Sequence, residues 1–66
     1  MDSDYIPSGL FTKLKDQFKS TNVYAEIFMG DLYLCKEGGR NIGIRTISEL
    51  KAAYFKLTNE QLIVPE

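Results

Sequence analysis

The chain has 66 residues, a formal net charge of −1, one cysteine (Cys35) and no histidine. A chain of this length forms a single domain that buries only about 60% of the surface exposed when it is unfolded. One cysteine without histidine excludes an internal disulfide and a zinc site, and the near-neutral charge argues against general polyanion binding. Self-association is the remaining way to stabilise so small a core, so we expect a homo-oligomer, with a dimer favoured.

The sequence gives no sign of a membrane or secretory address. No apolar run approaches the roughly 20 residues that a membrane span needs. The acidic start, residues 1–4, differs from the basic start of a secretory signal, and a lone free cysteine suits a reducing compartment. We therefore expect a cytoplasmic protein with no membrane partner.

A helix is predicted over Ser8–Lys19, after an N-terminal extension of residues 1–7. Ser8 follows a proline and precedes the apolar pattern, so it is the expected N-cap. The apolar residues of this helix fall within one arc of about 100°, the width of a core-facing stripe. They are Leu10, Phe11, Leu14 and Phe18.

From Val23 to Lys36 the apolar period changes to two, which predicts a β-hairpin. Gly30-Asp31 is the expected two-residue turn, of type II′, and pairs Met29 with Leu32. This register separates the hairpin into two faces. A core face carries Val23, Ala25, Ile27, Met29, Leu32 and Leu34, and a mixed face carries Tyr24, Glu26, Phe28, Tyr33, Cys35 and Glu37.

A third strand is expected over Ile42–Arg45, after a turn at residues 37–41. A connection of odd length places both isoleucines on the core face and Arg45 beside Tyr33, and one of even length reverses this. We favour the odd connection, because a slip of one residue exposes Ile42 and Ile44 together.

Thr46-Ile47-Ser48-Glu49 is a capping box, in which the Thr46 hydroxyl and the Glu49 carboxylate accept from backbone amides at a helix start. The helix that follows carries Ile47, Leu50, Ala53, Tyr54 and Leu57 on one side and is expected to end at Thr58-Asn59. Residues 60–66 form an apolar C-terminal tail. The predicted fold is α+β, a single small domain with the order helix, three-stranded antiparallel meander, helix.

The three aromatics of the mixed face are too many for a freely solvated sheet. Three coverings remain open: the first helix with Phe11, Leu14 and Phe18, a second copy of the chain, or a foreign partner. On the second helix, Phe55 points away from the core arc, so either the tail residues 62–64 or a partner covers it. The candidate interface residues are Tyr24, Phe28, Tyr33, Phe11, Phe18, Phe55 and Ile63.

No catalytic, cofactor-binding or metal-binding motif is present. Glu26 and Glu37 share the mixed face but have no nucleophile or histidine beside them, so we interpret them as surface charges. Cys35 lacks a histidine that would lower its pKa, and we interpret it as a small packed residue. We therefore predict a non-enzymatic protein–protein interaction module that associates with itself.

Residues 23–57, with three strands, a turn arginine and the helix entry Arg45-Thr46-Ile47-Ser48-Glu49-Leu50, resemble the plan of AP2-type and integrase arm-type DNA-binding domains. In those families the sheet face away from the helix enters the major groove. The resemblance implies an alternative function, nucleic-acid binding through Lys36, Arg40 and Arg45. In size, the chain also resembles accessory proteins encoded by phages and prophages.

Overall fold

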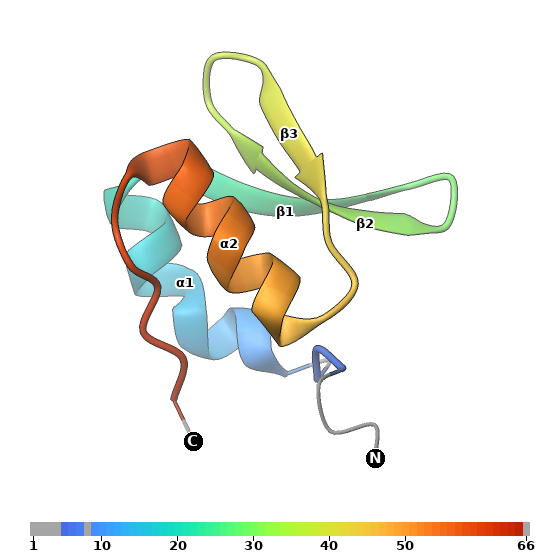
Figure 1. The fold of residues 1–66 in the computed structure, drawn as a ribbon, viewed down its shortest axis with the longest axis horizontal. Coiled ribbons are helices and arrows are strands. Elements are labelled where there is room, and N and C mark those ends of the chain that lie inside the picture. Colours follow the sequence, from blue (N-terminus) through green and yellow to red (C-terminus); the bar gives the residue numbers. More distant parts are fainter. Residues whose placement is uncertain (1–4, 8, 66) are drawn as a thin grey trace.

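The computed structural model describes residues 5–7 and 9–65, and it confirms the predicted α+β fold (Figure 1). The elements are α1 (Leu10–Ser20), β1 (Val23–Phe28), β2 (Asp31–Lys36), β3 (Arg40–Gly43) and α2 (Ile47–Thr58). The strands form one antiparallel sheet in the order β1-β2-β3, so β1 and β3 are its edges.

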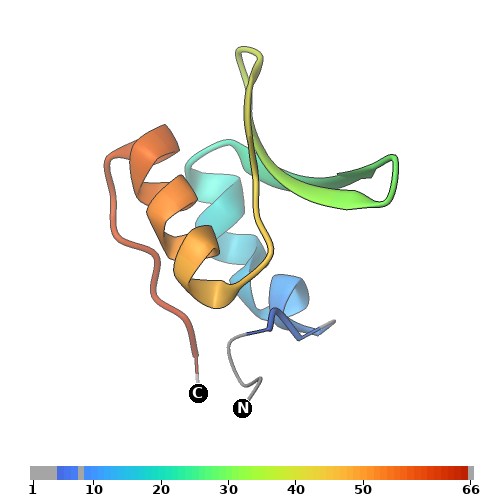
Figure 2. The ribbon, with the colours of Figure 1, turned by 45° about the vertical axis from the view of Figure 1, so that its right-hand side comes forward.

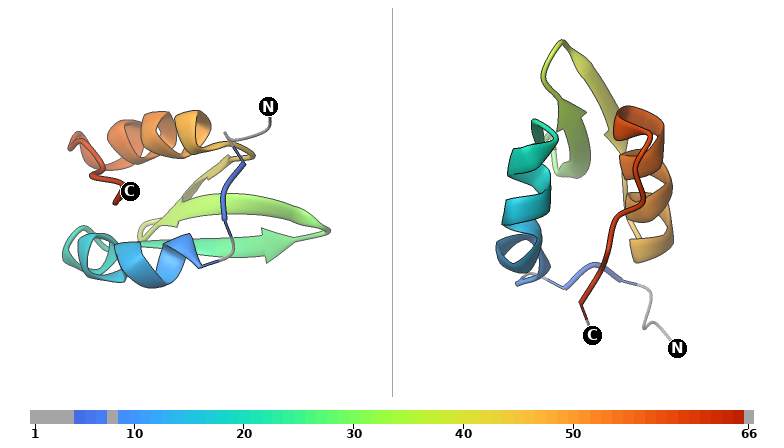
Figure 3. Two further views of the ribbon diagram at one scale, coloured as in Figure 1. Left: turned by 90° about the horizontal axis from the view of Figure 1, so that it is seen from below. Right: turned by 90° about the vertical axis from the view of Figure 1, so that its left-hand side faces the viewer.

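Both helices lie on the same face of the sheet, side by side (Figure 2, Figure 3). The rings of Phe18 in α1 and Tyr54 in α2 stack with centroids 5.8 Å apart, so the helices contact each other directly. One core cluster joins the two layers: Leu10, Leu14, Phe18, Val23, Leu34, Ile44, Leu50, Ala53, Tyr54, Leu57 and Leu62. The alternative in which the first helix covers the mixed face is therefore wrong, because the stripe of α1 is buried in the same core as that of α2.

Helix α1 begins at Leu10, two residues later than predicted, and ends at Ser20, one residue later. Gly9 occupies the N-cap position, where it has no side chain with which to cap the helix. The predicted cap, Ser8, lies outside the described residues. At the other end, Lys36 Nζ donates to the Thr21 carbonyl oxygen at 3.1 Å. A cation at this position is favourable, because the partial negative charge of a helix is at its C-terminus.

The β1–β2 turn is Met29-Gly30 rather than Gly30-Asp31, so the predicted turn was wrong. Phe28 pairs with Asp31 and Ile27 with Leu32, a shift of two positions from the predicted pairing of Met29 with Leu32. Both turn residues have positive φ, +54° and +83°, as a type I′ turn requires. A shift of two preserves which side chains share a face, so the division into two faces is confirmed.

The core face is not buried along its whole length, as had been expected. Val23 and Leu34 are buried, but Ile27 and Met29 are 72% and 83% exposed. The reason is geometric: the β1–β2 hairpin extends beyond the ends of both helices (Figure 1), so no helix covers its outer half.

Strand β3 begins at Arg40 and ends at Gly43, two residues earlier than predicted at each end. Lys36 pairs with Arg40, so the connection has the favoured odd length of three residues. Ile42 is half-buried opposite Leu34 and Ile44 is buried, as predicted. Arg45, however, follows the strand, and the residue opposite Tyr33 is Gly43.

Helix α2 confirms the predicted stripe and its end, with Asn59 in the left-handed conformation as C-cap. The Glu49 amide donates to Thr46 Oγ1 at 3.1 Å, which is one half of the capping box. The other half differs, because the Glu49 carboxylate accepts from the Arg45 amide, at 2.8 Å, instead of the Thr46 amide.

The C-terminal tail packs against α1 and does not cover Phe55. Leu62 is buried in the core, and the Gln17 side chain makes two hydrogen bonds to the Ile63 backbone. Gln17 Nε2 donates to the Ile63 carbonyl at 2.7 Å, and the Ile63 amide donates to Gln17 Oε1 at 3.0 Å. Phe55 remains 54% exposed, so of the two coverings left open for it, the one by the tail is wrong.

Candidate functional site

No segment of residues 5–7 and 9–65 covers the sheet face opposite the two helices, and we call this the open sheet face. By strand alternation, the side chains on this face are those of Tyr24, Glu26, Phe28, Asp31, Tyr33, Cys35 and Asn41. Three predicted interface residues therefore come together here: Tyr24 is 50% exposed, Phe28 is 61% exposed, and Tyr33 is half-buried.

The centre of the open sheet face is a hollow of about 380 Å³. It is lined by Glu26, Phe28, Tyr33, Cys35 and Asn41. The Tyr33 ring forms one wall and lies over Gly43, with Cε2 3.6 Å from where a Cβ would stand, an ordinary contact distance. The hollow therefore has aromatic walls and a polar side chain from each strand.

The open sheet face is acidic. The side chains on it that are charged at neutral pH, among those from the strands, are Glu26 and Asp31, with no lysine or arginine among them. Burial, helped by the Glu26 carboxylate, raises the pKa of the Cys35 thiol, which lies 3.8 Å from Glu26 Oε1 and donates to it. The pKa of Tyr24 is also raised, chiefly by the neighbouring Cys35 and then by loss of hydration. At neutral pH both groups therefore keep their protons and act as hydrogen-bond donors.

Next to the open sheet face is the hairpin tip, which we define as Ile27, Phe28 and Met29. All three side chains are more than half exposed, and they are consecutive in the chain. Because successive residues of a strand point to opposite faces, Phe28 lies on the open sheet face and Ile27 on the helix side, so the hairpin tip exposes apolar side chains on both faces of the sheet. The sequence analysis missed Ile27 and Met29 because their alternation is the same as that of core residues.

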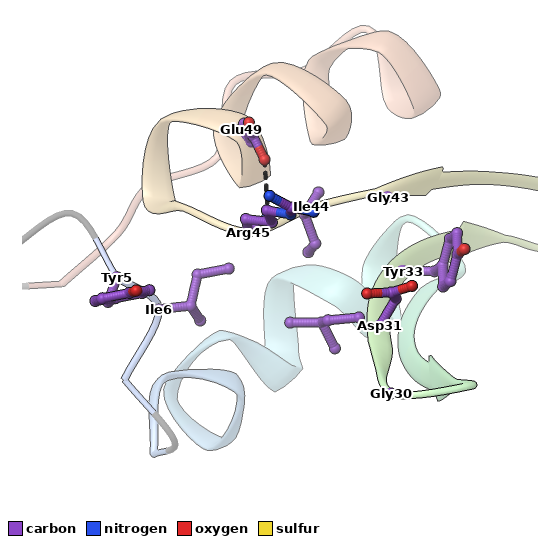
Figure 4. A pocket seen from close by; sticks show the side chains of 10 residues that line it. Tyr5, Ile6, Gly30, Asp31, Tyr33, Gly43, Ile44, Arg45 and Glu49 are labelled. Atoms are coloured by element: carbon purple, nitrogen blue, oxygen red, sulfur yellow. Dashed lines mark hydrogen bonds between the residues drawn. The ribbon is translucent and has the colours of Figure 1, made fainter.

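A second cavity, of about 690 Å³, lies on the helix side of the hairpin (Figure 4). It is bordered by the N-terminal segment, the start of α2, the outer part of β2 and the end of β3. Tyr5 forms an isolated bridge with Thr46 at one side, and Arg45 and Glu49 line the same cavity. This cavity is wide and open, and the Glu49 carboxylate in it already accepts a hydrogen bond from the Arg45 amide. The cavity therefore provides no preformed set of converging polar groups.

The other predicted interface residues lie away from the open sheet face. Phe18 is a core residue with 6% exposure, and Phe11 is half-buried, with its ring centroid 5.9 Å from that of Phe18. Phe55 on α2 and Ile63 on the tail are both exposed.

The cations of the nucleic-acid alternative are not gathered on the open sheet face. Lys36 and Arg40 pair across β2 and β3 on the side of the helices, and the Lys36 ammonium is bound to the end of α1. Arg45 lies beyond β3 at the second cavity. The face that would enter a groove therefore carries carboxylates where phosphate contacts need positive charge.

Searches against protein-family models, curated proteins and solved structures find no match to this chain. Within residues 5–7 and 9–65, no helix is long and apolar enough to cross a membrane. No group of three or more histidine, cysteine, aspartate or glutamate side chains in that same part of the chain is arranged to hold a metal ion.

Proposed function

We propose that this protein is a non-catalytic, cytoplasmic protein–protein interaction module that associates with itself through the open sheet face and the hairpin tip. The observation that carries the proposal is the uncovered sheet face. Two helices pack on one side of the sheet, and three aromatic side chains are left on the other side with no part of the described chain over them. In so small a domain, a partner adds the buried apolar area that the core alone lacks.

The conformation of Met29 supports the same surface. Met29 has φ +54°, in the left-handed region that residues other than Gly, Asn and Asp rarely adopt, and its side chain is 83% exposed. A left-handed residue with a Cβ costs about 1–2 kcal/mol. In the monomer this methionine thus combines a strained backbone with an unburied side chain, a combination that is understandable when the side chain contacts a partner.

A non-catalytic role agrees with the chemistry of the open sheet face. Its one thiol, Cys35, is buried and has a raised pKa, so it is mostly the unreactive protonated form at neutral pH. Among the described residues, the only nucleophilic group that contacts Glu26 is this protonated thiol, and no group of three or more histidine, cysteine, aspartate or glutamate side chains is arranged to hold a metal ion.

The proposal is tested by comparing two phenylalanines of similar exposure on the two surfaces. Burying the exposed 61% of Phe28 contributes about 1–2 kcal/mol per copy, or about 2–4 kcal/mol in a symmetric dimer. Phe28→Ser is therefore expected to raise the dimer dissociation constant about 30- to 700-fold in sedimentation equilibrium. Phe55→Ser, with the same loss of a half-exposed ring from α2, is expected to leave it nearly unchanged.

Two outcomes contradict the proposal. One is a wild-type chain that stays monomeric at every concentration. The other is weakening by Phe55→Ser with no effect of Phe28→Ser, because this places the interface on the helix layer.

A further inference from the structure

The outer edge of β1 is open to strand addition. The Glu37 amide donates to the Asn22 carbonyl at 3.0 Å, which makes this pair a hydrogen-bonded pair of the β1–β2 ladder. Hydrogen-bonded and non-hydrogen-bonded pairs alternate along an antiparallel ladder. The backbone groups of Tyr24, Glu26 and Phe28 are therefore directed at β2, and those of Val23, Ala25 and Ile27 are directed at the outer edge.

The two edges of the sheet differ in their protection. Edge strands normally avoid pairing with other chains by being short or by carrying lysine, proline or a bulge. Strand β3 has four residues and includes Arg40 and Gly43, whereas β1 has six residues without lysine, arginine, proline or a bulge. Strand β1 also ends at the exposed apolar hairpin tip. Of the two edge strands, β1 is therefore the less protected against pairing with a strand of another chain.

We propose that the occupant of this edge is β1 of a second copy, paired antiparallel with Ala25 on the two-fold axis. This inference rests on the proposed self-association and specifies its geometry. A two-fold axis makes the two strands antiparallel and the interface identical on both sides. The sheets of the two copies then become one sheet of six strands.

The backbone restricts the possible registers. Only the residues with outward-directed groups can exchange hydrogen bonds, so Val23, Ala25 and Ile27 must face one another across the axis. Two registers satisfy this condition and use nearly the whole strand. One places Ala25 opposite Ala25 and the other places Glu26 opposite Glu26.

Charge selects between the two registers. With Glu26 on the axis, two carboxylates meet in a non-hydrogen-bonded pair whose Cα atoms are about 4.5 Å apart, and like charges directly opposite destabilise a sheet. With Ala25 on the axis, each Glu26 faces Tyr24 of the other copy. The raised pKa of Tyr24 keeps its phenol protonated, and the phenol can donate to that carboxylate.

The same register brings two apolar residues that the monomer exposes, Ile27 and Phe28, beside the other copy, while Met29 lies past the end of the paired segment. On the helix side, Ile27 of each copy lies opposite Val23 of the other. On the open side, Phe28 is diagonal to Tyr24 of the other copy, at about 7–8 Å, a distance that aromatic side chains span. The two open sheet faces become continuous, and the rings of Phe28 and Tyr24 meet across the junction of the two copies.

Cysteine cross-linking tests the register directly. Tyr24→Cys and Glu26→Cys are made separately in a Cys35→Ala background, so that only the introduced thiols react, and both sites are at the surface of the open sheet face. In the proposed register these two positions face each other at about 4.5 Å between Cα atoms, a distance that a disulfide can bridge. Like positions are diagonal, at about 7–8 Å, beyond disulfide reach.

The mixture of the two variants is therefore expected to form a disulfide-linked heterodimer, and each variant alone is expected to stay unlinked. Efficient self-linking of Glu26→Cys overturns the register in favour of the one centred on Glu26. Self-linking of Tyr24→Cys overturns it in favour of a shorter overlap. A wild-type dimer in which no combination links refutes the β1 edge but leaves the proposed self-association intact, while a wild-type monomer refutes both.

A matched pair of proline variants tests which edge is used. Ala25→Pro removes an amide directed at the outer edge of β1, so the β1–β2 ladder of the monomer keeps its bonds. Asn41→Pro does the same on β3, since the Ile44 amide donates to Leu32 and the ladder alternates from there. Light scattering should show the 7.5 kDa chain mass for Ala25→Pro and twice that mass for Asn41→Pro. The opposite result overturns the proposal.

Discussion

Met29→Asn is expected to stabilise the monomer. The backbone at residue 29 has φ +54°, and the next residue, Gly30, has φ +83°. Asn-Gly is among the preferred sequences for a turn with two positive φ values, because asparagine adopts the left-handed conformation with less strain than methionine. The side chain of Met29 is 83% exposed, so its removal creates no cavity.

The expected gain is about 1 kcal/mol, the lower end of the cost of a left-handed residue with a Cβ. For a domain of this size, about 1 kcal/mol raises the melting temperature by roughly 4–8 °C. The change is measured by thermal unfolding followed by circular dichroism. Dilute samples are needed, because dimer formation stabilises the folded chain and obscures the effect of the turn.

Ile27→Asn is the control, since it makes the same polar change on an exposed side chain of the hairpin tip, but in extended backbone. Asparagine is unfavourable in strands, so this variant should melt at the same or a lower temperature. If Met29→Asn fails to raise the melting temperature of the monomer while the control behaves as expected, the argument that Met29 is strained is wrong. If both variants weaken the dimer, the hairpin tip belongs to the interface.

Three further predictions concern the core, the tail and pH. Leu34→Ala, at a position with no solvent exposure, should lower the free energy of unfolding by about 2–5 kcal/mol. This is comparable with the whole stability of a small core, about 3–5 kcal/mol, so circular dichroism should show a largely unfolded chain. A folded variant contradicts the packing of Leu34 in the core. Gln17→Ala should release the tail, because both hydrogen bonds to Ile63 are lost, and hydrogen exchange should speed up at the Ile63 amide; unchanged exchange contradicts the role of Gln17. The raised pKa values of Cys35 and Tyr24 give stability that is complete below their unfolded values, 9.0 and 10.0, and that is lost as pH rises through the folded values. The free energy of unfolding measured with urea should therefore fall progressively above about pH 9, and Cys35→Ala should remove the earlier part of this fall. A free energy of unfolding that stays constant from about pH 8 to 11 contradicts this prediction.

The sequence predicted those features that depend on local chemistry. Thr46 and Glu49 cap a helix whose apolar stripe is unambiguous, and the structure confirms its end at Thr58. The division of the hairpin into two faces was also correct, because it depends only on alternation and survived a register error of two residues.

The errors arose where two local solutions were nearly equivalent. Both Met29-Gly30 and Gly30-Asp31 give two-residue turns, and the sequence rules favour glycine over methionine at the first position. The side of the sheet that α1 covers could not be predicted either. A stripe such as that ending in Phe18 shows that a helix buries one face, but it does not show against which face of a sheet it packs.

The sequence predicted which aromatic residues form the candidate site but not which exposed residues surround them. Tyr24, Phe28 and Tyr33 share a face as expected, but the neighbouring tip residues Ile27 and Met29 were assigned to the core. Their exposure depends on how far the hairpin extends past the helices, which is a property of element lengths in three dimensions and not of alternation.

The most direct test of self-association is the mass of the wild-type chain in solution, measured by light scattering over a dilution series. We predict twice the 7.5 kDa chain mass at high concentration, falling towards 7.5 kDa on dilution. A mass of 7.5 kDa at every concentration contradicts self-association and the pairing of β1 with a second copy.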